Sequence, residues 1–138
     1  MNSPPGADPK STPAVAGLSV AGVLDADALA RLQDLDPSGQ AGLMARVLST
    51  YTRSLERQLD ILNSARLNAD VQAQRHVAHT LKSSSASVGA LQLSALCADV
   101  EHKLRDGQVE GIEIQLDALT REAARILAAL RDTPAPSP

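Results

Sequence analysis

The sequence predicts an all-α fold: an antiparallel four-helix bundle with a short additional N-terminal helix. Between Pro37 and Pro134 the chain contains no proline, and it is dense in residues that favour helices. Apolar residues recur in this segment every three or four positions, the period of an amphipathic helix. The chain also has no Phe or Trp and only 1 Tyr, so aliphatic residues must form the core, which suits packed helices better than a sheet.

Turn residues divide this segment into helical stretches, of which the first two precede Ala65. A short helix is expected from about Asp25, a plausible N-cap, to Leu35. Residues 36–39 (Asp-Pro-Ser-Gly) are typical of a turn and of a new helix start. The second helix carries regularly spaced apolar residues and is expected to end near Ala65.

Three further helices complete the predicted bundle. The third begins with a cap at Asn68 or Asp70 and ends just before Gly89, a residue that suits a helix C-terminus. The fourth stops at Gly107, and the fifth ends before Pro134. Short loops between long helices favour antiparallel neighbours, which is why we expect a bundle.

The two ends of the chain differ from this segment in composition. Residues 1–21 are rich in Pro, Ala, Ser and Gly and show no sustained periodicity, and residues 133–138 contain 3 prolines. We expect a disordered tail or linker at the start, a disordered tail at the end, and a helical bundle over residues 22–132.

Charge and composition exclude several classes of function. The formal net charge is −3 with both signs interspersed, which argues against nucleic-acid binding. No apolar run approaches the ~20 residues of a membrane span, and the N-terminus lacks the regions of a signal peptide. We therefore expect a cytoplasmic protein without a membrane partner. Cys97 is the only cysteine, so no internal disulfide can form.

The third helix is expected to have a thin apolar stripe and a broad polar face. At about 100° per residue, the core-facing stripe comprises Val77, Leu81, Ser84 and Val88, with Ser85 at its margin. The opposite face should point to solvent near the middle of the helix. Its members are Gln72, Arg75, His79, Lys82, Ser83 and Ala86.

His79 has surroundings that suit phosphoryl transfer. Its imidazole is a good nucleophile near neutral pH, and Arg75 and Lys82 lie one turn to either side, where they can offset phosphoryl charge. Ser83 and Ala86 are small enough to admit a partner's reactive group. The chain shows no nucleotide-binding loop and no magnesium site, so no cofactor is expected, and the donor and any metal must come from a partner. An exposed helical histidine is nevertheless most often an ordinary surface residue.

The residues around His79 resemble a known family. The segment HVAHTLKSSSASVGALQLSALCADVEHKL, residues 76–104, closely resembles the histidine-containing phosphotransfer (HPt) domain family. That family's hallmark is Ala-His-x-Leu-Lys followed by small residues and a glycine, which residues 78–87 and Gly89 match. A weaker resemblance extends over about residues 24–130, the whole expected bundle.

The resemblance implies a phosphorelay intermediate that is not itself a kinase. His79 would accept the phosphoryl group through Nε2, Lys82 would offset its charge, and Ser83 would occupy the family's small, often glycine, position. The implied partners are receiver domains, of a hybrid histidine kinase and of a downstream regulator, docking on the second and third helices. Gln72, Arg75 and Ala86 are further candidates for this contact surface. We expect a monomer, because one bundle uses all the apolar stripes.

Two residues depart from the family pattern. Ser83 replaces the usual glycine, which could slightly narrow the approach of a partner. Tyr51 stands where the family often has phenylalanine, so its hydroxyl needs a hydrogen-bond partner if the ring is buried. Neither departure removes the chemistry at His79.

The remaining polar residues are expected to be ordinary surface or core residues without a chemical role. His76 lies at the edge of the polar face and is expected to be a surface residue, and Cys97 is expected to be a buried small hydrophobe. No metal site is expected. Glu101, His102 and Lys103 are expected to form a solvated charged patch on the fourth helix.

Two functions other than a relay could also place a histidine on such a helix. A histidine-kinase dimerisation helix pair also carries a phosphohistidine, but there an acidic residue and then a proline follow the histidine. Thr80, Leu81 and Lys82 follow His79, and the helix has no proline, which argues against a kinase. The other alternative is a non-catalytic helical adaptor that binds receiver domains or kinases, in which the histidine is incidental.

Overall fold

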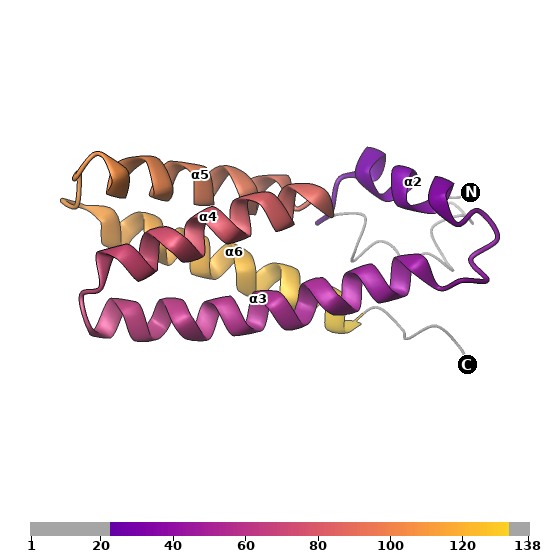
Figure 1. Cartoon of the computed structure of the whole chain (residues 1–138), viewed down its shortest axis with the longest axis horizontal. Coiled ribbons are helices and arrows are strands. Elements are labelled where there is room, and N and C mark those ends of the chain that lie inside the picture. The colour runs from indigo at the N-terminus through magenta and orange to yellow at the C-terminus, as the bar shows by residue number, and fades with distance from the viewer. Residues whose placement is uncertain (1–22, 133–138) are drawn as a thin grey trace, which may run out of the picture.

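The computed structural model describes residues 23–132, and the two expected tails, 1–21 and 133–138, lie outside the described residues. The described part is all-helical, which confirms the predicted fold class. Figure 1 shows its helices, which are α2 (Ala26–Leu35), α3 (Leu43–Leu67), α4 (Val71–Ser87), α5 (Leu91–Arg105) and α6 (Ile112–Asp132). None of these helices is long and apolar enough to cross a membrane.

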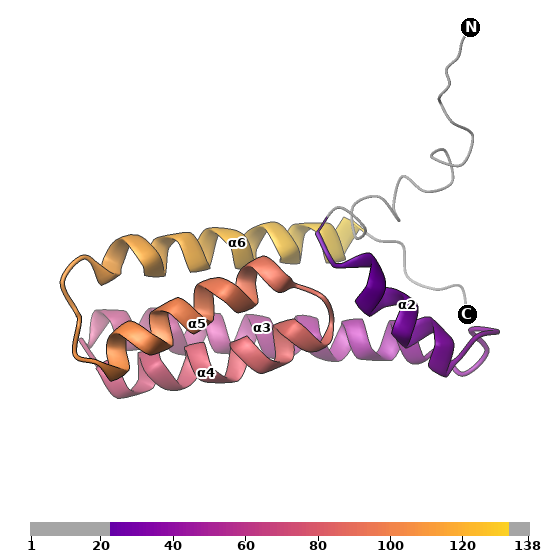
Figure 2. The same cartoon turned by 90° about the horizontal axis from the view of Figure 1, so that it is seen from above.

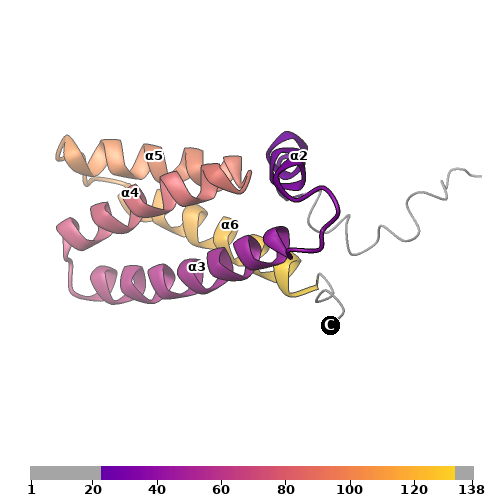
Figure 3. The same cartoon turned by 45° about the vertical axis from the view of Figure 1, so that its right-hand side comes forward.

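Helices α3 to α6 form the bundle, and α2 lies at one end of it (Figures 1 and 2). Helix α3 is the longest, and its N-terminal part extends past the ends of α4 and α5 to lie beside α2 (Figure 3). Aliphatic side chains fill the centre of the bundle, as the composition predicts. Those with at most 1 % exposure include Leu55, Leu62, Leu81, Leu93, Leu116, Leu119 and Ile126.

Aspartate carboxylates accept backbone amide hydrogen bonds at the start of three of the helices, and two of these aspartates are the N-cap residues. Asp25 accepts a hydrogen bond from the Ala28 amide (3.1 Å) and caps α2 as predicted. Asp70, rather than Asn68, caps α4, and Asn68 instead ends α3. Helix α3 begins later than the turn sequence suggested, at Leu43, because the Asp36 carboxylate accepts a bond from the Leu43 amide (3.1 Å) across the turn.

Gly89 joins α2 to the turn between α4 and α5. Its φ of +85° lies in the left-handed region that glycine adopts readily, as expected at this helix end. Its carbonyl also accepts a hydrogen bond from the Asp25 amide at 2.7 Å. A Cβ at this position would lie 2.8 Å from the Cβ of Ala28, so any other residue would displace α2.

The core-facing side of α4 is rotated from the predicted stripe. Val77, Leu81 and Val88 are buried as expected, but Ser85 is completely buried and Ser84 is only half-buried. The prediction was wrong here because Ala78 is buried too, which moves the centre of the buried side toward Ser85.

Burial of Ser85 provides the partner that Tyr51 needs. The Tyr51 hydroxyl and Ser85 Oγ lie 2.8 Å apart in a buried hydrogen bond between α3 and α4. Burial raises the pKa of Tyr51 to about 12, so the phenol stays protonated at neutral pH. The aromatic ring and its hydroxyl are therefore both accommodated in an otherwise aliphatic core.

Candidate functional site

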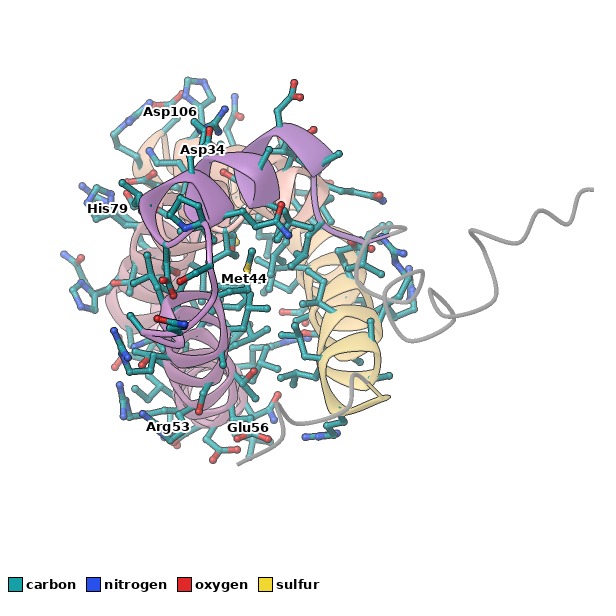
Figure 4. The ribbon with its side chains drawn as sticks, turned by 90° about the vertical axis from the view of Figure 1, so that its right-hand side faces the viewer. Asp34, Met44, Arg53, Glu56, His79 and Asp106 are labelled. Carbon is teal, nitrogen blue, oxygen red and sulfur yellow. The ribbon has the colours of Figure 1, made fainter. Side chains whose placement is uncertain are left out.

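His79 lies near the middle of α4 on the side that faces away from the core. Its side chain is 61 % exposed, and Figure 4 shows it pointing outward from the bundle. The neighbouring Val77, Ala78 and Leu81 are buried, which holds this part of the helix against the core. The imidazole is thus accessible to another protein while its backbone is held in place.

Glu101 of α5 orients the imidazole. Its Oε2 lies 2.6 Å from Nδ1 of His79. An ionised carboxylate can only accept hydrogen bonds, so Nδ1 must donate and carries the proton. In the neutral ring the lone pair is then on Nε2, the nitrogen that is not bonded to Glu101. This arrangement prepares Nε2 to act as a nucleophile.

The same carboxylate binds Lys82. Lys82 Nζ donates to Oε1 of Glu101 at 2.7 Å, so the ammonium and the imidazole are held by the two oxygens of one side chain. The Lys82 hydrogen bond is the main reason that the pKa of Glu101 lies below its usual value. The bond to His79 acts in the same direction, and burial opposes both. Glu101 therefore remains ionised at neutral pH, as this geometry requires.

The position of Glu101 corrects the sequence-based expectation of a solvated patch. Its relative exposure is 9 %, because α5 packs along α4 and turns this carboxylate toward the interface. His102 is exposed as expected, with Nε2 3.2 Å from Asp106. A signal for Glu101 was present in the sequence: it falls four residues after Cys97 and three before Leu104, on the buried side of its helix.

The other predicted site residues form the surface around the ring. Gln72, Ser83 and Ala86 are exposed on the same side of α4, and Arg75 is half-buried. Of these predicted residues, His79 and Lys82 are brought together by their shared contact with Glu101. Arg75 forms no ion pair with any residue in the described part of the chain. Ser94 of α5 donates to the Lys82 carbonyl at 2.8 Å, which further ties the two helices together.

Two residues considered for other chemistry lie where the sequence suggested. Cys97 is buried, and burial raises the pKa of its thiol to about 12, so it is not a thiolate at neutral pH. His76 is exposed on α4. Across residues 23–132, no group of three or more His, Cys, Asp or Glu side chains gathers in a way that could hold a metal ion.

The described part of the chain is thus a helical bundle that exposes a histidine bonded to a carboxylate of the neighbouring helix. A sequence model of the Hpt domain matches residues 46–131, more than half of the chain, so the chain belongs to the Hpt domain family. Its function is therefore of the histidine phosphotransfer class, within phosphorelay signalling.

A solved structure supports the same assignment. The chain is similar to histidine-containing phosphotransfer protein B (HptB) from Pseudomonas aeruginosa PAO1, with a TM-score of 0.70 and 29% sequence identity. The match covers 80% of this chain and 93% of that protein. None of the curated proteins matched the chain.

Proposed function

We propose that this protein is a phosphorelay intermediate in which His79 accepts a phosphoryl group from one receiver domain and passes it to another. The observation that carries the proposal is the contact between Glu101 and Nδ1 of His79, which makes Nε2 the lone-pair nitrogen of the neutral ring, while the same carboxylate holds the Lys82 ammonium. Members of the family interact with receiver domains, which makes an aspartyl phosphate the natural donor.

The transfer can be written as one displacement at phosphorus. The Nε2 lone pair of His79 attacks the phosphorus atom, a P–N bond forms, and the P–O bond to the donor's aspartate breaks to release its carboxylate. The Nδ1 proton stays on the ring, so a positive charge develops on the imidazole directly against Glu101. Lys82 offsets the charge of the phosphoryl oxygens. Delivery to the second receiver is the reverse reaction, with that receiver's aspartate as nucleophile.

The exposed surface of α3 and α4 around His79 is the proposed docking surface for both receivers. Gln72, Arg75, Ser83 and Ala86 lie on it, and the small Ser83 and Ala86 leave room beside the ring. We further propose that the chain acts as a monomer, that it has no kinase activity of its own, and that it works in the cytoplasm. The upstream partner would then supply both the phosphoryl group and any metal ion.

A transfer experiment with a matched control tests the site. Purified protein is incubated with a receiver domain that is phosphorylated on its aspartate, and the label on the protein is measured. We expect acid-labile, base-stable phosphate on the wild type and on His76→Gln, and none on His79→Gln. His76 is the matched control because it is an exposed histidine one turn earlier on the same helix.

The same experiment separates the relay from the adaptor. If several phosphorylated receivers bind the wild type, circular dichroism shows a folded helical protein and no phosphate reaches it, the relay proposal is wrong. The protein would then act as a helical adaptor for receiver domains.

A further inference from the structure

Helix α3 carries three exposed arginines on one side. Arg46, Arg53 and Arg57 are spaced by seven and four residues, which at about 100° per residue places them within roughly 40° of one another. We call these three residues the arginine stripe. Figure 4 shows Arg53, from the middle of the stripe, pointing outward from the bundle, as His79 does.

The stripe lies on the outward side of α3, between the sides that face α4 and α6. Arg66 and Glu56 form ion pairs with Asp117 and Arg131 on α6, so their side of α3 faces α6. Arg46 lines a groove between α3 and α4, and together with Arg53 it also lines a larger hollow bounded by residues of α2 and α6. Arg57 lies eleven residues after Arg46, almost the same direction around the helix, so it lies on the same outward side.

The register between α3 and α4 brings Arg57, the last residue of the stripe, level with His79. The two helices are antiparallel, and Tyr51 contacts Ser85 while the Gln74 amide donates to the Ala65 carbonyl (3.2 Å). These two contacts place α3 residues 57–60 opposite His79. Since packed helices lie about 8–10 Å apart, Arg57 stands on the neighbouring helix at the level of the reactive imidazole.

The stripe carries charge that the fold does not neutralise. Arg66, Arg125 and Arg131 each form an ion pair within the bundle. Among residues 23–132, the stripe residues form none: Arg46 donates to the Ala41 carbonyl, and Arg53 donates to its neighbour Ser49. Two carboxylates border this surface: Asp60, one turn beyond Arg57, and Glu56, which is paired with Arg131. A chain of net charge −3 thus presents positive charge beside its reactive residue.

We propose that the arginine stripe is a docking site that selects receiver domains whose docking face, outside the phosphorylation pocket itself, carries surface carboxylates. This inference rests on the proposed relay function and names the partner chemistry that the relay uses. Guanidinium groups without internal partners can form paired hydrogen bonds to carboxylates, and opposite surface charge accelerates encounter. Nucleic acid is a less favoured partner, because three arginines on a chain of net negative charge are too few to bind a phosphate backbone.

The test removes two charges of the stripe and uses a panel of purified receiver domains whose docking faces range from acidic to basic. Binding of each receiver is titrated against wild type, the Arg53→Gln/Arg57→Gln double variant and an Arg121→Glu control, which lowers the net charge by the same two units. Arg121 is exposed on α6 and has no ion pair among the described residues, so it reports the effect of net charge alone. Circular dichroism confirms that each variant is folded.

We expect the wild type and Arg121→Glu to bind acidic receivers most tightly. The double variant should lose roughly tenfold or more in affinity for the acidic receivers and gain affinity for the basic ones. Raising the salt concentration should weaken the wild-type preference, because exposed charges are screened.

Three outcomes would overturn the proposal. One is that the double variant ranks the receivers by affinity in the same order as the wild type does. Another is that the wild type binds acidic and basic receivers with equal affinity. The third is a short DNA duplex that displaces the receivers from the wild type, which would make the stripe a nucleic-acid site. Because binding is measured without transfer, these results stand even if a phosphorylated receiver fails to label His79, a failure that would count against the relay itself.

Discussion

Glu101 and Glu122 are both buried glutamates that form ion pairs, but their partners lie in different places. Glu122 of α6 pairs with Arg125 one turn further along its own helix, through two contacts of 2.9 and 2.7 Å. Glu101 of α5 reaches across to α4 and binds both His79 and Lys82. The first carboxylate is satisfied locally, while the second depends on how two helices pack.

This difference shows how a buried charge acquires a function. A buried carboxylate must be paired, because an unpaired one is costly to remove from water. When the pair forms within one helix, it restrains one side chain only. When it forms between helices, it also orients the group on the other helix, which here is His79, the proposed nucleophile. The following predictions test this contrast, from the largest expected effect to the smallest.

Replacing Glu101 should reduce phosphoryl transfer most. We expect Glu101→Ala to slow transfer from a phosphorylated receiver to His79 by about 10- to 100-fold, because the ring loses the group that fixes its tautomer and orientation. Single-turnover quench experiments measure the rate. Glu122→Ala is the matched control and should transfer at the wild-type rate, and a similar loss in both variants would show that burial of a charge, not contact with His79, is what matters.

Removing the cationic partner of each glutamate should change the transfer rate in one variant only, while both variants lose a similar, small amount of stability. Lys82→Met leaves Glu101 with one partner and removes the ammonium beside the phosphoryl group, so transfer should fall about tenfold. Arg125→Met should leave transfer unchanged. Because both cations are more than one-third exposed, each variant should lose only about 1 kcal/mol of unfolding free energy in urea titrations. Equal transfer rates in the two variants would contradict this assignment.

A buried pair without charge offers a third comparison. Tyr51→Phe leaves Ser85 Oγ buried without its partner, and we expect a loss of about 1 kcal/mol in unfolding free energy. Transfer should stay at the wild-type rate, because this hydrogen bond lies in the core. Tyr51→Phe combined with Ser85→Ala should recover part of the lost stability, and its failure to do so would assign the loss to packing.

The smallest effect concerns pH. The pKa of Glu101 is lower in the folded protein than its ordinary value, so its pairing stabilises the fold at neutral pH. That contribution is fully present above the unfolded value, about 4.3, and is lost as pH falls through the lower folded value. Urea unfolding of wild type and Glu101→Gln should therefore differ at pH 7 and converge well below pH 4. A difference that persists at acid pH would point to a cause other than ionisation.

Local signals predicted most of the secondary structure. Asp25 caps α2, Gly89 ends α4, and the exposed side of α4 carries His79, all as the sequence suggested. These features follow from hydrogen bonds within a few residues and from the helical period, which the sequence contains directly. The start of α3 was less predictable, because the Asp36 carboxylate that accepts from the Leu43 amide lies seven residues earlier, across an irregular turn.

By itself, the sequence determined the helices, the aliphatic core and the solvent-facing position of His79, because each depends on residues close together in the chain. Only the tertiary structure decided that Glu101 binds His79 and Lys82, that Ser85 rather than Ser84 is buried, and that Arg57 stands level with the imidazole. Those contacts depend on the rotation and register of one helix against another. The helical period in the sequence does not determine the rotation or the register of a helix. Both are determined when the faces of neighbouring helices pack together.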